Sequence, residues 1–157
     1  MKKLVLLSAS ILLLISCGKK ENATSDFSKP DQTENTVAGN DSYDPKKGEG
    51  KYDKVDLPEK LDQQLASLGA TVSGTKCTSC HKLTDEKLVG PGWKGVTERR
   101  TPEWIMNFIT NPDPMIDKDP ELQAQLELCL VRMPNQSLTD DEARQILEYM
   151  RKNDGVQ

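Results

Sequence analysis

The sequence predicts an all-α domain of four or five short helices over residues 58–157. Apolar side chains recur there at helical spacing, beginning with Leu61, Leu65, Leu68 and Val72. Three segments open with residues that favour helix starts, Thr101-Pro102, Asp119-Pro120 and Thr139. No run alternates apolar and polar side chains as a half-buried strand would.

The first helix is expected to begin near Pro58 and to run into the low seventies. Gly69, Ser73 and Gly74 weaken its last turns. Residues 82–100 show no sustained periodicity and contain the run GPGW, so they are expected to form a loop.

The remaining helices have clearer boundaries. Thr101 caps a helix that Asn111-Pro112 ends. The run NPDPM that follows is expected to be a proline-rich loop, and a further helix is expected over residues 120–130. Thr139 and Glu142 form a capping box that opens the last helix.

The N-terminus has the pattern of a secretory signal peptide over residues 1–16. Lys2 and Lys3 precede an apolar run over residues 4–15. That run is too short for a membrane-spanning helix, which needs about 20 residues. The alternative, a buried core helix, would have no polar face.

The run Leu14-Ile15-Ser16-Cys17 resembles a bacterial lipobox, which implies cleavage before Cys17 and attachment of lipid to its thiol. An ordinary signal peptide is the alternative, and it would leave Cys17 as a free thiol. Gly18 after the cysteine slightly favours the outer membrane over the inner one. Acyl chains at Cys17 would anchor the protein to a membrane.

Residues 18–57 hold few side chains that a core could bury. The larger apolar ones are Phe27, Val37, Tyr43, Tyr52, Val55 and Leu57. Their burial cannot offset the entropy lost when such a segment becomes ordered. We therefore expect residues 17–57 to be a lipidated cysteine and a flexible polar tether. The alternative is that the segment folds onto the domain.

The charge balance argues against a nucleic-acid-binding role. The chain has a formal net charge of −4, and removal of Lys2 and Lys3 with the signal peptide leaves 19 basic and 25 acidic side chains. Residues 76–100 carry a net charge of +3, whereas residues 101–154 carry −6. The basic part is a candidate surface for an acidic partner, and an ordinary solvated surface is the alternative.

The run Cys77-Thr-Ser-Cys80-His81 has the spacing of a c-type haem attachment site. The two thiols would bond the porphyrin, and the adjoining histidine would bind the iron. A zinc site, a redox dithiol, a disulfide and a chance occurrence are the alternatives. Zinc needs four ligands and the mature chain has no second histidine, while a thioredoxin-like dithiol needs a βαβ unit. The core is also thin enough to need a bound cofactor.

With these pieces in order, residues 66–152 resemble the class I monohaem c-type cytochromes. The shared features are CTSCH, the run LVGPGW, Met133-Pro134 and the helix that Thr139 opens. The resemblance implies a cytochrome c-like fold around one covalently bound haem c. It also implies that Gly90 and Pro91 pack beside His81 and that Met133 is the sixth iron ligand.

Other methionines and several polar or aromatic residues are secondary candidates. Met115 is the rival sixth ligand, whereas Met106 and Met150 are expected to pack in the core. Candidate contacts to the haem propionates are Trp93, Arg99 and Trp104.

The chain also departs from the pattern of the family. Ser73 stands where relatives commonly have an aromatic residue, and the helix over 120–130 is absent from many small members. Cys129 has no evident partner in the sequence. It is expected to be a buried apolar residue, with an intermolecular disulfide or a redox role as the alternative.

The resemblance implies a membrane-tethered electron carrier on the periplasmic side of a bacterial envelope, not an enzyme. A quinol-oxidising complex is the expected donor, and nitrous-oxide reductase or a terminal oxidase the expected acceptor. Nitrous-oxide reductase is an expected acceptor because residues 99–107 are similar to small lipoprotein cytochromes found beside that enzyme. The alternative is a haem-based sensor, or a ligand-binding or catalytic haem protein, with a labile sixth ligand.

Overall fold

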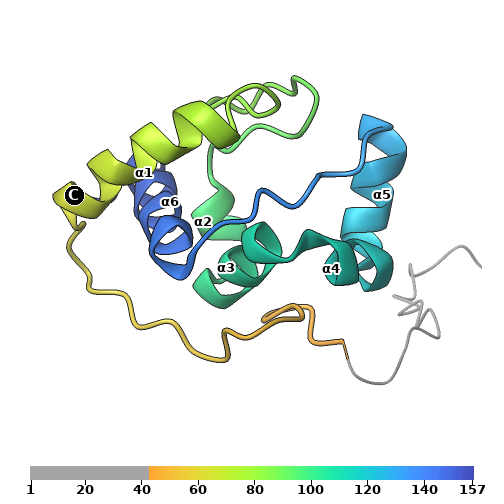
Figure 1. Ribbon diagram of the computed structural model, residues 1–157, viewed down its shortest axis with the longest axis horizontal. Coiled ribbons are helices and arrows are strands. Elements are labelled where there is room, and N and C mark those ends of the chain that lie inside the picture. Colours follow the sequence, from red (N-terminus) through yellow and green to blue (C-terminus); the bar gives the residue numbers. More distant parts are fainter. Residues whose placement is uncertain (1–42) are drawn as a thin grey trace, which may run out of the picture. The chain divides into compact units, whose positions relative to one another are not determined.

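The computed structural model describes residues 43–157, which form six helices (Figure 1). They are α1 (Gln63–Lys76), α2 (Val96–Arg99), α3 (Pro102–Thr110), α4 (Pro112–Lys118), α5 (Pro120–Cys129) and α6 (Asp140–Asn153). Residues 43–157 contain no β-strand and only two isolated bridges, Asp44 with Gly48 and His81 with Lys87. The all-α prediction is confirmed, with two short helices more than the boundary signals indicated.

Helices α1 and α6 form the most extensive helix pair of the domain, and they cross in Figure 1. Small residues allow the close approach. A Cβ at Gly69 would overlap the Gln145 carbonyl group and lie 2.9 Å from Cβ of Tyr149. Ser73, one turn further along α1, is fully buried. A small side chain therefore fits this face of α1, where relatives commonly have an aromatic one.

Side-chain caps set the starts of four helices, α1, α3, α5 and α6, and three of these caps lie where the sequence predicts them. Thr101 Oγ1 accepts a hydrogen bond from the Trp104 backbone N–H at the start of α3. Thr139 and Glu142 form the capping box at the start of α6. The first helix begins later than expected, because Asp62 caps it through the backbone N–H groups of Gln64 and Leu65.

Helix α4 replaces the proline-rich loop expected over residues 111–115. Its first turn holds Pro112 and Pro114, and proline is tolerated there because the first N–H groups of a helix have no intrahelical partner. Burial of Met115 and Ile116 stabilises the short helix. In the same way, the expected loop over residues 82–100 contains one helical turn, α2.

Residues 43–57, which we call the strap, lie against the helices and are not the free tether that the sequence indicates. Tyr52 packs against the core, and its backbone N–H donates to Asn107 Oδ1 at 2.9 Å. The backbone N–H of Val55 donates to Glu103 at 2.7 Å, and the Tyr43 hydroxyl donates to Asp119 at 2.6 Å. The composition of the strap led to the wrong expectation, because its order depends on hydrogen bonds to polar side chains of the helices.

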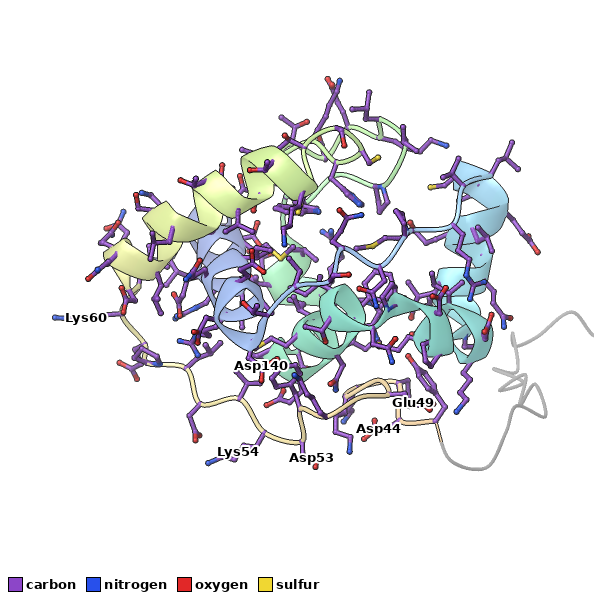
Figure 2. All side chains as sticks on the ribbon, in the orientation of Figure 1. Asp44, Glu49, Asp53, Lys54, Lys60 and Asp140 are labelled. Carbon is purple, nitrogen blue, oxygen red and sulfur yellow. The ribbon has the colours of Figure 1, made fainter. Side chains whose placement is uncertain are left out.

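The outer side of the strap is charged. Figure 2 shows Lys54 of the strap and Lys60, which follows the strap, pointing away from the helices. Lys54 pairs only with Asp56 among the described residues. The predicted signal peptide, Cys17 and residues 18–42 lie outside the described residues. Within residues 43–157 no helix is long and apolar enough to cross a membrane.

The core is built by α3, α4 and α6 together with single residues from the loop before α2 and from α5. Its buried members are Trp93, Trp104, Ile105, Met106, Ile109, Met115, Ile116, Leu122, Ala143, Ile146, Leu147 and Met150. Seven of them line a cavity that the CTSCH turn also lines: Trp93, Trp104, Ile105, Ile109, Leu122, Ile146 and Met150.

Candidate functional site

A cavity of about 520 Å³ lies between the CTSCH turn, α3, α6 and the segment that leads into α6. Its volume is in the range of sites for cofactors and other small molecules. The apolar part of its wall includes Trp104, Ile105, Phe108, Leu122, Ile146 and Met150. A smaller cavity of about 100 Å³ adjoins it beside α5.

Cys77 and Cys80 lie on a tight turn at the end of α1 and both line the larger cavity. The backbone N–H groups of Cys80 and His81 both donate to the Cys77 carbonyl at 3.0 Å, which closes this turn. The two thiols are free and are not joined to each other. Burial raises the pKa of the Cys77 thiol, so it is a neutral thiol at pH 7.

His81 is oriented by the loop that contains Gly90 and Pro91. Its Nδ1 lies 2.8 Å from the Pro91 carbonyl oxygen, which accepts a hydrogen bond from Nδ1–H. This bond leaves the lone pair on Nε2, which is the arrangement of a metal-binding imidazole. Burial lowers the pKa of His81, although the bond to Pro91 acts in the opposite direction. The neutral form that binds metals is therefore favoured.

Gly90 is required by its closeness to the imidazole ring. A Cβ at this position would lie 2.8 Å from His81 Nδ1 and still closer to Cε1. The backbone N–H of Gly90 donates to the Cys80 carbonyl at 2.9 Å, so the loop is also bonded to the cysteine turn. Gly90 and Pro91 thus lie beside the His81 ring, as the resemblance implied.

Met133 and Pro134 line both cavities from the segment between α5 and α6. Met133 therefore shares a cavity with His81, Cys77 and Cys80. Met115, the rival ligand, is fully buried in α4 and lines neither cavity.

Two further methionines were expected to pack in the core. Met106 is buried and does not line either cavity, whereas Met150 is buried at the wall of the larger one. Among the described methionines, Met133 combines access to the cavity with a position on irregular backbone.

The residues expected to contact propionates have different surroundings. The Trp93 ring lies 5.8 Å from the His81 ring between centroids, and Arg99 lines the cavity while donating to the Lys94 carbonyl at 2.7 Å. Trp104 also lines the cavity, but its indole N–H donates to Asp119 at 3.2 Å. The expected propionate contact of Trp104 is therefore not supported, since that donor is already used.

Arg100 lines the cavity and was missed from the sequence. Its guanidinium carbon lies 4.2 Å from the centroid of the Trp104 ring, and its side chain pairs with Glu121. The basic pair Arg99-Arg100 four residues before an aromatic residue was the available signal. Both arginines line the cavity, which depends on the backbone path and was not evident from the sequence.

The residues present fit a covalently held haem. Two thiols, one imidazole with a free Nε2 and one thioether line a single, mainly apolar cavity, and this is the donor set of a c-type haem with histidine and methionine ligands. Across residues 43–157 no three His, Cys, Asp or Glu side chains gather into a potential metal site, so the zinc alternative lacks its ligands there. Cys129, expected to be buried, is partly exposed and lines the smaller cavity.

Comparison with known proteins agrees with this donor set. The model of the family described as cytochrome c matches residues 66–154. A cytochrome c from Rhodothermus marinus is similar to the chain at 38 % identity and a TM-score of 0.64, over 67 % of this chain and 90 % of that one. An engineered form of that protein bound to a carbene intermediate is similar at 37 % identity and a TM-score of 0.60, with the same coverage.

The curated proteins gave no match. The family match covers more than half of the chain and includes CTSCH, Gly90-Pro91 and Met133. The chain therefore belongs to the cytochrome c family, whose members have this helical fold and carry covalently bound haem c.

Proposed function

We propose that this cytochrome is a one-electron carrier whose haem iron is held by His81 and Met133. The observation that carries the proposal is that His81, Met133, Cys77 and Cys80 line one cavity. A haem in that position supplies reversible one-electron exchange between ferric and ferrous iron.

The chain's own residues would hold and tune that group. Pro91 keeps the His81 ring in one tautomer through its carbonyl, and Gly90 lets the loop approach the ring. Apolar walls from α3 and α6 limit access of water. As the second ligand of the haem iron, the Met133 sulfur would raise the reduction potential and would leave no position for a substrate, which favours electron carriage over catalysis.

The proposal includes attachment to a bacterial membrane on its periplasmic side. Its basis is the signal pattern over residues 1–16 and the lipobox-like run before Cys17. A lipid on Cys17, with the outer membrane slightly favoured, would keep the domain close to respiratory complexes. The proposed donor is a quinol-oxidising complex, and the proposed acceptor is nitrous-oxide reductase or a terminal oxidase.

A haem protein with a displaceable sixth ligand is the second candidate. It is favoured by the irregular backbone that carries Met133 and by the related engineered cytochrome c that holds a carbene intermediate. If the second candidate is right, the reduced wild-type protein will bind carbon monoxide readily. Electron carriage by a closed haem predicts slow and incomplete binding.

The ligand assignment is tested by Met133→Ala. The oxidised wild-type protein should show the weak charge-transfer absorption band of a methionine sulfur bonded to iron, and the variant should lack it. The reduction potential should fall in the variant, because the sulfur ligand stabilises the ferrous state. Visible absorption spectra and a potentiometric titration measure both effects.

Met115→Ala is the matched control. It should keep the band but destabilise the fold by about 2–5 kcal/mol, since it removes a fully buried methionine. A band that survives in Met133→Ala, or that disappears only in Met115→Ala, would show that the proposed ligand is wrong.

A further inference from the structure

Five apolar side chains are exposed near the smaller cavity, and we call them the apolar rim. They are Leu88, Val89, Leu128, Leu130 and Val131. The exposed fraction is 84 % for Leu130 and 68 % for Leu128. Single exposed leucines are common, but a group from two separate segments is a feature of interaction surfaces.

Both the backbone conformation and the exposure of Leu130 are unfavourable for a leucine. It terminates α5 with a φ of 58°, in the left-handed region where glycine or asparagine is usual. Within residues 43–157 it gains no burial in return. Neither backbone preference nor burial explains a leucine here, so contact with another molecule is the role that we consider for it.

The rim lies beside the proposed haem site. Val89 and Val131 line the smaller cavity together with Cys80 and Met133. The Lys87 ammonium donates to the Leu128 carbonyl at 2.7 Å, which joins the loop after CTSCH to the end of α5. Leu88, Leu128 and Leu130 line neither cavity, so a group bound there would leave them exposed.

Two basic side chains near the rim are paired with acidic ones, whereas Lys87 is bonded to the Leu128 carbonyl. Lys82 pairs with Glu86 at 2.6 Å. Arg132 pairs with both Asp113 and Asp117 at 2.7 Å. Paired charges exert little long-range attraction, so electrostatic steering is not the main source of binding at this face.

We infer that the apolar rim is the docking surface for a redox protein whose own docking face is apolar and uncharged. This inference rests on the proposed electron transfer and names the face through which it occurs. Contact at the rim would bring the partner next to Cys80 and Met133. Residues 18–42 of this chain offer only two larger apolar side chains, Phe27 and Val37, to cover the rim instead.

The experiment uses the haem-loaded mature chain with Cys17→Ser and gold electrodes coated with alkanethiol monolayers. A methyl-terminated monolayer is the probe for apolar docking, and a carboxylate-terminated monolayer is its charged counterpart. The wild type should give a larger voltammetric current at the methyl surface, with little dependence on salt. Leu128→Gln with Leu130→Gln should reduce that current at least about tenfold, because two apolar contacts are lost.

Two variants separate docking from folding. Leu68→Gln, on α1 and 44 % exposed, is the matched control and should leave the current unchanged. Leu130→Gly should keep or raise the unfolding temperature, because glycine suits the left-handed backbone, and yet it should lower the current. A lower current without loss of stability is the expected signature of the rim.

Oxidation of the reduced protein by ferricyanide, a small soluble reagent, tests electron transfer separately and should be equal in all variants. If ferricyanide fails to oxidise the wild type, the proposed function fails. If ferricyanide oxidises every variant but the methyl-surface current does not depend on the rim, only the docking inference is wrong. The inference is also overturned if the rim variants dissociate a dimer in sedimentation, or abolish binding to phosphatidylcholine vesicles.

Discussion

Cys77, Cys80 and His81 are neighbours in the chain, and the sequence alone predicted their grouping in one site. The tight turn after α1 needs only local hydrogen bonds, such as that from the His81 N–H to the Cys77 carbonyl at 3.0 Å. Trp104 is different, because its N–H is taken by Asp119, 15 positions further along the chain. A donor's partner at that separation cannot be derived from spacing, so the sequence did not show that Asp119 takes the indole N–H of Trp104.

Gly90→Ala should disturb the haem site at the scale of a single methyl group. The added Cβ would overlap the His81 ring and displace either the ring or the loop. The expected result is weaker His81 ligation, seen as a changed visible spectrum and a lower unfolding temperature of the haem-loaded protein.

Gly74→Ala is the control for Gly90→Ala, because a Cβ there meets no atom within 4 Å. It should be neutral, or stabilise α1 by up to about 1 kcal/mol through helix propensity. Equal effects of the two substitutions would contradict the proposed close contact.

At the scale of elements, helix starts were predictable because caps are local. Thr101, Asp119 and Thr139 each cap the helix that follows them. The strap was not predictable from composition, since its bonds are to side chains of distant helices. The side-chain amide of Asn107 by itself makes three of these bonds: it accepts from the Tyr52 N–H and donates to the carbonyl oxygens of Lys47 and Tyr52.

Asn107→Ala should release the strap. It removes the fully buried amide that makes three hydrogen bonds and leaves backbone groups of the strap unpaired. The expected loss of stability is about 2 kcal/mol or more. Thermal unfolding measures the loss, and faster proteolytic cleavage between residues 43 and 57 shows where the structure opens.

Lys54→Ala is the matched control for the strap. Lys54 is exposed and pairs only with exposed Asp56 in the described part of the chain, so its removal should change little. If Asn107→Ala leaves cleavage within the strap as slow as in the wild type, the strap is not held by that amide.

At the scale of the whole molecule, the strap shortens the chain available between the proposed lipid and the domain. Residues 18–42 extend to at most about 90 Å, whereas the tether expected from the sequence ran to residue 57. The domain would therefore reach redox partners within a narrower zone above the membrane.

Cys17→Ser should move the protein from the membrane fraction to the soluble fraction, because the serine hydroxyl does not take the thioether-linked lipid. Cell fractionation with haem staining measures the distribution. Cys129→Ser, which leaves the proposed lipid site intact, is the control and should stay with the membrane. A Cys17→Ser protein that remains membrane-bound would contradict lipid anchoring.

The sequence by itself determined the helical class, the helix caps and the haem-attachment motif, because each depends on residues a few positions apart. Family resemblance added Met133 as the expected ligand. Only the tertiary structure decided that Met133 shares the cavity with His81 while Met115 is buried in α4. It also decided that residues 43–57 lie on the domain and that Leu130 is exposed in a left-handed conformation. These features depend on groups far apart in the chain, whose positions are set by the packing of the helices.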